Sequence, residues 1–223
     1  MLLDFLALVT GTFVALLPIA NPFSTAPVFA AITRDMSPAR REQQARLACT
    51  YMAAVLLVAL LAGALILTFF GISIHALRVA GGLIIARIGF GMLNPSPTPE
   101  LTEESRQEAM DRVDIAFTPI AMPLLSGPGS IAVTIGMATS AARPLEFVAI
   151  AIGIAAVSLA SWLVLHFANR VAGFLGVTGM TALTRVMGLL LVGIGVQFVF
   201  TGTISAFTSE AVVSAIQAAL GAG

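Results

Sequence analysis

Two short segments of the sequence set polar side chains, glycines and prolines inside long apolar stretches. Residues 18–27 read PIANPFSTAP and residues 119–128 read PIAMPLLSGP, so Pro, Ile, Ala, Pro and Pro recur at the same spacing. A proline has no N–H to give to the carbonyl four residues earlier, so each copy leaves backbone carbonyls without a helical partner. In lipid such groups are costly unless protein or water satisfies them. We therefore expect two broken helices that line a binding site.

The residues at these breaks could bind a ligand that carries one positive and one negative charge. A half-helix that starts after a break presents free N–H groups and the positive end of its dipole, which attract a carboxylate. Ser24 or Thr25 is expected to cap the first half-helix. Ser126 or Gly127 is expected to cap the second, with Pro128 at its first position. The freed carbonyls suit an ammonium group, so the breaks together match an amino-acid zwitterion.

The predicted substrate-binding residues are Asn21, Pro22, Ser24, Thr25, Ser126, Gly127, Gly129 and Ser130. The alternative is that the prolines only kink two helices for packing.

Composition places these segments in a membrane. The chain has 223 residues, of which 58% are hydrophobic and 10% charged, and its mean hydropathy is +1.01. A soluble domain carries about 25% charged residues, so the expected solvent is lipid. The formal net charge is zero, which gives no indication of a nucleic-acid partner.

Six apolar segments are expected to span the bilayer, and most have roughly the 20 residues that a membrane helix needs. They cover residues 5–33, 47–70, 77–94, 115–139, 145–167 and 184–205. The first, at about 29 residues, is longer than a straight span requires, which favours a broken segment. Segment three contains GLIIARIGF and segment six contains GLLLVGIGV, so the repeat extends beyond the prolines, and these glycines predict close packing seams. Three segments per half is an odd number, so the second half must enter the membrane from the opposite side. The predicted fold is an all-α membrane protein of two inverted three-helix repeats, with segments one and four discontinuous.

The distribution of arginine predicts the orientation and the division of the chain. The first, third and fifth connections hold most of the arginines, so they are expected to be cytoplasmic and both termini periplasmic. The expected division is a first repeat (1–95), a cytoplasmic acidic linker (96–114), a second repeat (115–207) and a periplasmic C-terminal tail (208–223).

Few other residues could do chemistry. Arg87 lies near the middle of segment three, where a charge is costly. It is either a substrate, coupling or gating contact, or a side chain that reaches the membrane surface or pairs with the freed carbonyls. No Asp or Glu falls inside an apolar core, and Glu146 sits at the edge of segment five. With no acid pair, Cys/His dyad or metal-ligand cluster, we expect no enzyme activity, catalytic residue, metal or cofactor.

Four stretches resemble the MarC family of bacterial inner-membrane proteins. They are LLPIANPFSTAPVF (16–29), FGISIHALRVAGGLIIARIGFGML (70–93), IAFTPIAMPLLSGPGSIA (115–132) and RVMGLLLVGIGVQF (185–198). The resemblance covers nearly the whole chain. It implies six membrane segments in an inverted three-plus-three repeat, outside termini and, for SnatA-type relatives, export of small neutral amino acids such as glycine and alanine.

The sequence thus predicts a bacterial inner-membrane transporter that exports a small neutral amino acid by alternating access. A passive channel for a small solute or ion, and a non-transporting membrane scaffold, are the alternatives. The lipid bilayer and the substrate are the expected partners, and a homo-oligomer is left open.

Overall fold

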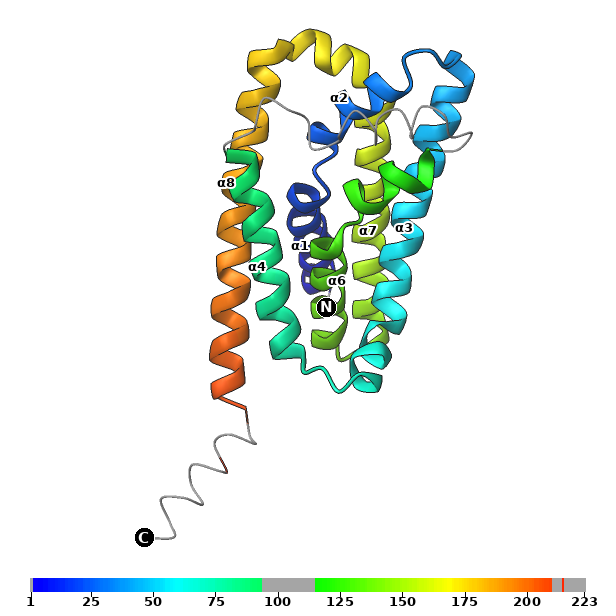
Figure 1. Cartoon of the computed structure of the whole chain (residues 1–223). Coiled ribbons are helices and arrows are strands. Elements are labelled where there is room, and N and C mark those ends of the chain that lie inside the picture. Colours follow the sequence, from blue (N-terminus) through cyan, green and yellow to red (C-terminus); the bar gives the residue numbers. More distant parts are fainter. Residues whose placement is uncertain (1, 94–114, 210–213, 215–223) are drawn as a thin grey trace.

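The structure is a computed structural model that describes residues 2–93, 115–209 and 214, and every regular element in this part of the chain is a helix. This confirms the all-α prediction. The predicted linker (96–114) and nearly all of the tail (208–223) lie outside the described residues. The helices are α1 (Leu2–Ala20), α2 (Pro22–Ile32), α3 (Pro38–Phe69), α4 (Ile74–Leu93), η1 (Ala116–Leu125), α6 (Pro128–Ser140), α7 (Pro144–His166) and α8 (Ala168–Phe207) (Figure 1).

Prolines open four of these helices. The first residues of α2, α3, α6 and α7 are Pro22, Pro38, Pro128 and Pro144. At this position the missing N–H would have had no partner within the helix, and the fixed φ of proline suits the first turn. Ser37 caps α3 in addition, because its hydroxyl oxygen accepts the N–H of the third helical residue at 3.4 Å.

The helices account for the expected membrane spans. Five are long and apolar enough to cross a membrane, and η1 with α6, bent by 64° at their junction, make a sixth if they count as one span. Helix α2 has 11 residues and would reach only about 17 Å, against a hydrocarbon core of about 30 Å. Helix α3 begins nine residues before the predicted span, because Ser37 and Pro38 start the helix within the polar sequence PARREQQAR.

The outer surface of the bundle is apolar, as lipid contact requires. Large hydrophobic side chains are exposed on several helices, among them Leu61, Leu65, Leu83, Leu159, Leu189 and Phe200. The interior is also apolar, and its fully buried side chains include Leu16, Phe29, Met52, Ile85, Ile120 and Ile154. Both faces of the helices are therefore hydrophobic, which is typical of a membrane bundle.

Successive long helices run in opposite directions, so the connections gather at two ends (Figure 1). The upper end in the figure holds the turn between α2 and α3 and the junction of α7 with α8. There Trp162 donates to Glu42 Oε1 at 3.0 Å, and His166 Nδ1 contacts Glu42 Oε2, which ties α7 to α3. The lower end holds the α3–α4 and α6–α7 connections and the end of α8, and there Arg78 of α4 donates to Ser140 of α6 at 2.7 Å.

Glycines bring α4 and α8 into close contact. A methyl group added to Gly82 would lie 2.5 Å from the Gly195 carbonyl oxygen, and one added to Gly89 would lie 2.7 Å from that of Gly188. Residue numbers rise along one helix as they fall along the other, so the pair is antiparallel. The predicted seams are therefore packing contacts within one chain. The pairing is reciprocal between the two sequence repeats, as a twofold axis relating them would require, although the inverted repeat itself stays a prediction.

Candidate functional site

The first break is a single residue, Asn21, between α1 and α2. Its φ of 40° and ψ of 61° lie in the left-handed region, which asparagine tolerates better than most residues. Its Oδ1 accepts the Ser24 N–H at 3.3 Å, and its Nδ2 donates to the Ser24 hydroxyl at 2.7 Å. Asn21 is therefore the N-cap of α2. The prediction that Ser24 or Thr25 would cap this half-helix is wrong, because Asn21 can both turn the chain and accept the hydrogen bond.

The side chains at this break reach two distant helices. Asn21 Nδ2 lies 3.4 Å from the sulfur of Met92 on α4, and the Ser24 hydroxyl lies 3.2 Å from that of Thr184 on α8. We call Asn21, Ser24, Met92 and Thr184 the Asn21 cluster. Asn21 is 7% exposed, so these contacts hold α2 against α4 and α8 inside the bundle, toward its upper end (Figure 1).

The second break is longer and is built from backbone. Thr118 and Met122, each followed by proline, have extended conformations inside η1, as expected for residues before proline. The peptide bonds to Pro119 and Pro123 are cis. Ser126 then closes the segment, because its N–H and its hydroxyl both donate to the Ala121 carbonyl at 2.8 Å.

Helix α6 restarts after this segment as predicted, with Gly127 as N-cap and Pro128 at the first position. A methyl group added to Gly127 would lie 2.8 Å from the Pro123 carbonyl oxygen, so the close turn needs glycine. In the first turn of α6, the Ser130 hydroxyl is buried and has no hydrogen-bond partner among the described residues. A buried, unpaired hydroxyl is uncommon in a folded protein.

The two breaks face one another through apolar contacts. A methyl group added to Gly129 would lie 3.3 Å from Cγ2 of Ile19, just before the first break, and 2.9 Å from Cγ1 of Ile85 on α4. The structure thus places the eight predicted residues in two groups at neighbouring breaks. The first group contains Asn21, Pro22, Ser24 and Thr25, and the second contains Ser126, Gly127, Gly129 and Ser130. Most of them are buried, and none lines the cavity described next.

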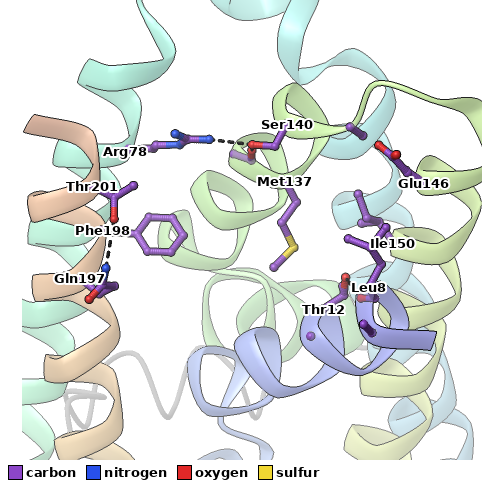
Figure 2. Close-up of a pocket in the computed structure, with 14 residues that line it drawn as sticks. Leu8, Thr12, Arg78, Met137, Ser140, Glu146, Ile150, Gln197, Phe198 and Thr201 are labelled. Atoms are coloured by element: carbon purple, nitrogen blue, oxygen red, sulfur yellow. Dashed lines mark hydrogen bonds between the residues drawn. The ribbon is translucent and has the colours of Figure 1, made fainter. Parts of the chain in front are cut away.

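A cavity of about 590 Å³ opens between α1, α4, α6, α7 and α8, near the end of the bundle that is lower in Figure 1. Figure 2 shows the residues that line it, with Arg78, Ser140 and Glu146 of that end at the top. Among its lining residues, Thr12 on α1 and Gly136 on α6 are the ones nearest to the breaks along these helices. Along α1 and α6 they lie eight and seven residues from Ala20 and Gly129, which corresponds to roughly 10–12 Å of helix. The walls are mostly apolar, with Leu8, Met137, Ile150 and Phe198 among the lining residues. The cavity therefore approaches the breaks without reaching them in this conformation.

Two opposite charges border the cavity, and sequence reasoning did not identify either as functional. Arg78 belongs to the second turn of α4 and Glu146 to the first turn of α7, and Figure 2 shows them on opposite sides of Ser140. A signal was present, because each is a charge near the start of an apolar helix that begins at the same end. Only the fold shows that the two face one space. Gln197 donates to Thr201 at 3.2 Å on the α8 wall.

Arg87 does not contribute to the cavity or to either break. Its side chain is exposed on α4, on the face that also exposes Leu83, Ile84 and Phe90. Of the two interpretations, this position fits a long side chain that extends along the outer surface toward the head groups. The coupling or gating role of Arg87 stays a prediction.

Comparison with known proteins identifies relatives along nearly the whole chain. Residues 6–207 match the model of the MarC family of integral membrane proteins. The chain is 39% identical over 202 residues to the UPF0056 inner membrane protein MarC of Citrobacter koseri and of Salmonella typhimurium, covering 86% of this chain and 91% of each relative. The protein of that name from Escherichia coli strain UTI89 is 39% identical over 200 residues, covering 85% and 90%. No solved structure matches the chain significantly.

Proposed function

Because the chain belongs to the MarC family of integral membrane proteins, we propose that it is a transporter that exports small neutral amino acids, such as alanine and glycine, in the manner of SnatA-type relatives. The observation that carries this proposal is the pair of buried helix breaks beyond the inner end of an open cavity. Discontinuous helices at corresponding places in two halves are typical of transporter binding sites. The substrate crosses the membrane chemically unchanged, so we propose no enzymatic step.

The substrate site in this proposal lies between the two breaks. At the start of α6 the N–H groups of Gly129 and Ser130 and the positive end of the helix dipole favour a carboxylate. The Ser130 hydroxyl, which has no partner among the described residues, would then donate to it. Backbone carbonyls of η1, which can each accept a second hydrogen bond, would accept from the ammonium group. The contact of Ile19 and Ile85 with Gly129 leaves space for a small side chain only, which favours glycine and alanine.

Alternating access in this proposal moves the closure from one end of the bundle to the other. The cavity opens at the lower end, and the Asn21 cluster joins α2, α4 and α8 nearer the upper end. With the arginine-rich connections in the cytoplasm, this conformation is open to the periplasm and closed to the cytoplasm. Separation of Ser24 from Thr184 would open the cytoplasmic side, while the lower helices close over the cavity.

Counterflow in proteoliposomes tests the function. Vesicles loaded with unlabelled alanine, with or without the purified protein, are diluted into labelled alanine, and we expect labelled alanine to accumulate transiently only where the protein is present. A passive channel gives flux without this overshoot. Equal, slow entry into both kinds of vesicle, for glycine as well as alanine, would overturn the proposal and favour the scaffold. Pro22→Ala and Pro123→Ala should abolish counterflow by a carrier but leave a scaffold intact.

A further inference from the structure

The cavity near the lower end has a charge arrangement that the helix breaks lack. Arg78 contributes a guanidinium from α4, and Glu146 contributes a carboxylate from α7. One N–H of Arg78 is used by the Ser140 hydroxyl at 2.7 Å, and Oε2 of Glu146 accepts the Ala142 N–H at 2.7 Å. No ion pair joins Arg78 to Glu146 in the part of the chain that the structure describes. Two opposite charges therefore border one space without forming an ion pair with each other.

This arrangement needs an explanation beyond solvation at the membrane surface. A position near a helix start explains why each charge is tolerated there, since the cost of a charge falls toward the interface. It does not explain why the charges come from different helices and border the same cavity, or why Ser140 of a third helix holds the guanidinium. Ionisable side chains that face a cavity within a membrane bundle commonly mark the path of a substrate.

We propose that this cavity is a second binding site, which holds neutral α-amino acids by their two charged groups at the periplasmic end of the transport path. Arg78 binds the α-carboxylate, because the planar guanidinium can donate two parallel hydrogen bonds to it. Glu146 accepts from the α-ammonium group. The amino-acid side chain lies against the apolar wall that includes Met137, Ile150 and Phe198. The inference rests on the proposed function, since it supplies the site that an exported substrate occupies before release.

The size of the cavity makes this site less selective than the breaks. Its volume of about 590 Å³ lies within the range of about 300–1,000 Å³ typical of small-molecule sites, which leaves room for side chains larger than that of alanine. The breaks, where Ile19 and Ile85 contact Gly129, admit only small ones. We therefore expect leucine to bind at the cavity and to compete with alanine there without being transported.

Calorimetric binding to the purified protein in nanodiscs tests the site independently of transport. The probes are alanine and leucine, with alaninamide lacking the carboxylate, propionate lacking the ammonium group, and the dipeptide Ala-Ala carrying the two charges farther apart. We expect both amino acids to bind measurably and each single-charge analogue to bind about tenfold to a hundredfold more weakly. Equal binding of alanine and alaninamide would overturn the role of Arg78. Tighter binding of Ala-Ala than of alanine would overturn the assignment to single amino acids.

Substitutions locate the binding. Arg78→Gln and Glu146→Gln should each weaken leucine binding by at least about tenfold, whereas Arg78→Lys, which keeps the charge, should weaken it less. Arg46→Gln and Asp35→Asn remove exposed charges away from the cavity and should leave binding unchanged. If alanine counterflow occurs but both cavity variants bind leucine like the unsubstituted protein, the second site is wrong and the transporter stands. If leucine binding depends on both residues but no amino acid crosses the membrane, the transporter fails and the site stands.

Discussion

The two helix breaks come from one repeated sequence, yet they are built differently. Asn21 in the first copy corresponds to Met122 in the second, and Asn21 takes a left-handed conformation where Met122 is extended. The helix restarts at Pro22 in the first copy, but only at Pro128 in the second, whose counterpart Pro27 lies well inside α2. Asparagine can turn the chain and cap the next helix itself, and methionine can do neither. In the second copy the helix therefore begins only after Gly127, which serves as its N-cap.

The two breaks also differ in the interactions that hold them in place. The first is held by side-chain hydrogen bonds to α4 and α8, and such bonds are worth about 0.5–1.5 kcal/mol each, so they can break and reform. The second is held by proline geometry and by the two bonds from Ser126 to the Ala121 carbonyl. If the proposed transport occurs, we expect the first break to move and the second to remain as a fixed frame for the ligand.

The largest expected effect comes from making the first break resemble the second. Asn21→Met removes the cap and places a poorly suited residue in the left-handed region, which should cost about 2–3 kcal/mol of unfolding free energy and abolish alanine counterflow. Thermal unfolding in detergent and the proteoliposome assay measure both. Asn21→Gly is the control, since glycine accepts the conformation but lacks the side-chain contacts. If Asn21→Gly transports alanine as fast as the unsubstituted protein, the cluster contacts do not control movement at this break.

An intermediate effect is expected where the second break touches its neighbours. Gly129→Ala would place a methyl group 2.9 Å from Ile85, and this overpacking should cost about 1–3 kcal/mol and narrow the space for substrate. Gly193→Ala is the matched control, because nothing lies within 4 Å of the added methyl group. It should be neutral or raise stability by up to about 1 kcal/mol. Comparable melting temperatures for the two variants would contradict the close contact at Gly129.

The smallest effect on stability, but a clear one on binding, is expected for Ser130→Ala. The hydroxyl has no partner to lose among the described residues, so the unfolding free energy should change by less than about 1 kcal/mol. Alanine transport should need about tenfold more substrate for half-maximal rate, because a hydrogen bond to the carboxylate is missing. Ser158→Ala removes another buried, unpartnered hydroxyl, on α7, and should leave transport unchanged. The same substrate requirement in both variants would show that Ser130 does not contact the ligand.

The sequence was sufficient for features that follow from chain-local chemistry. The matched prolines indicated two interruptions, and the Gly127–Pro128 pair indicated where α6 starts. The glycines of segments three and six indicated close packing. Features that depend on three-dimensional neighbours were missed. Nothing in the sequence pairs Ser24 with Thr184 or Asn21 with Met92. The helices between the two residues of each pair must be placed before either contact is apparent.

The charged cavity was missed for the same reason. Arg78 and Glu146 lie 68 positions apart, and each looks like an ordinary residue at the edge of a membrane span. The Asn21 cap was missed for a different, local reason. Serine and threonine are common N-caps, so the prediction chose Ser24 or Thr25. It overlooked that an asparagine directly before a proline can both turn the chain and cap the helix.

The glycine contacts between α4 and α8 have a mechanical consequence. Where Gly82 meets Gly195 and Gly89 meets Gly188, backbone lies on backbone with no side chain between, so little room is left for the two rods to slip or roll. Helices α4 and α8 should therefore move together as one rigid unit. Any rigid-body motion in the proposed transport cycle must then come from the helices packed against this unit, chiefly α1, α2 and α6. Bulky residues introduced between α4 and α8 should impair folding before they alter substrate selectivity.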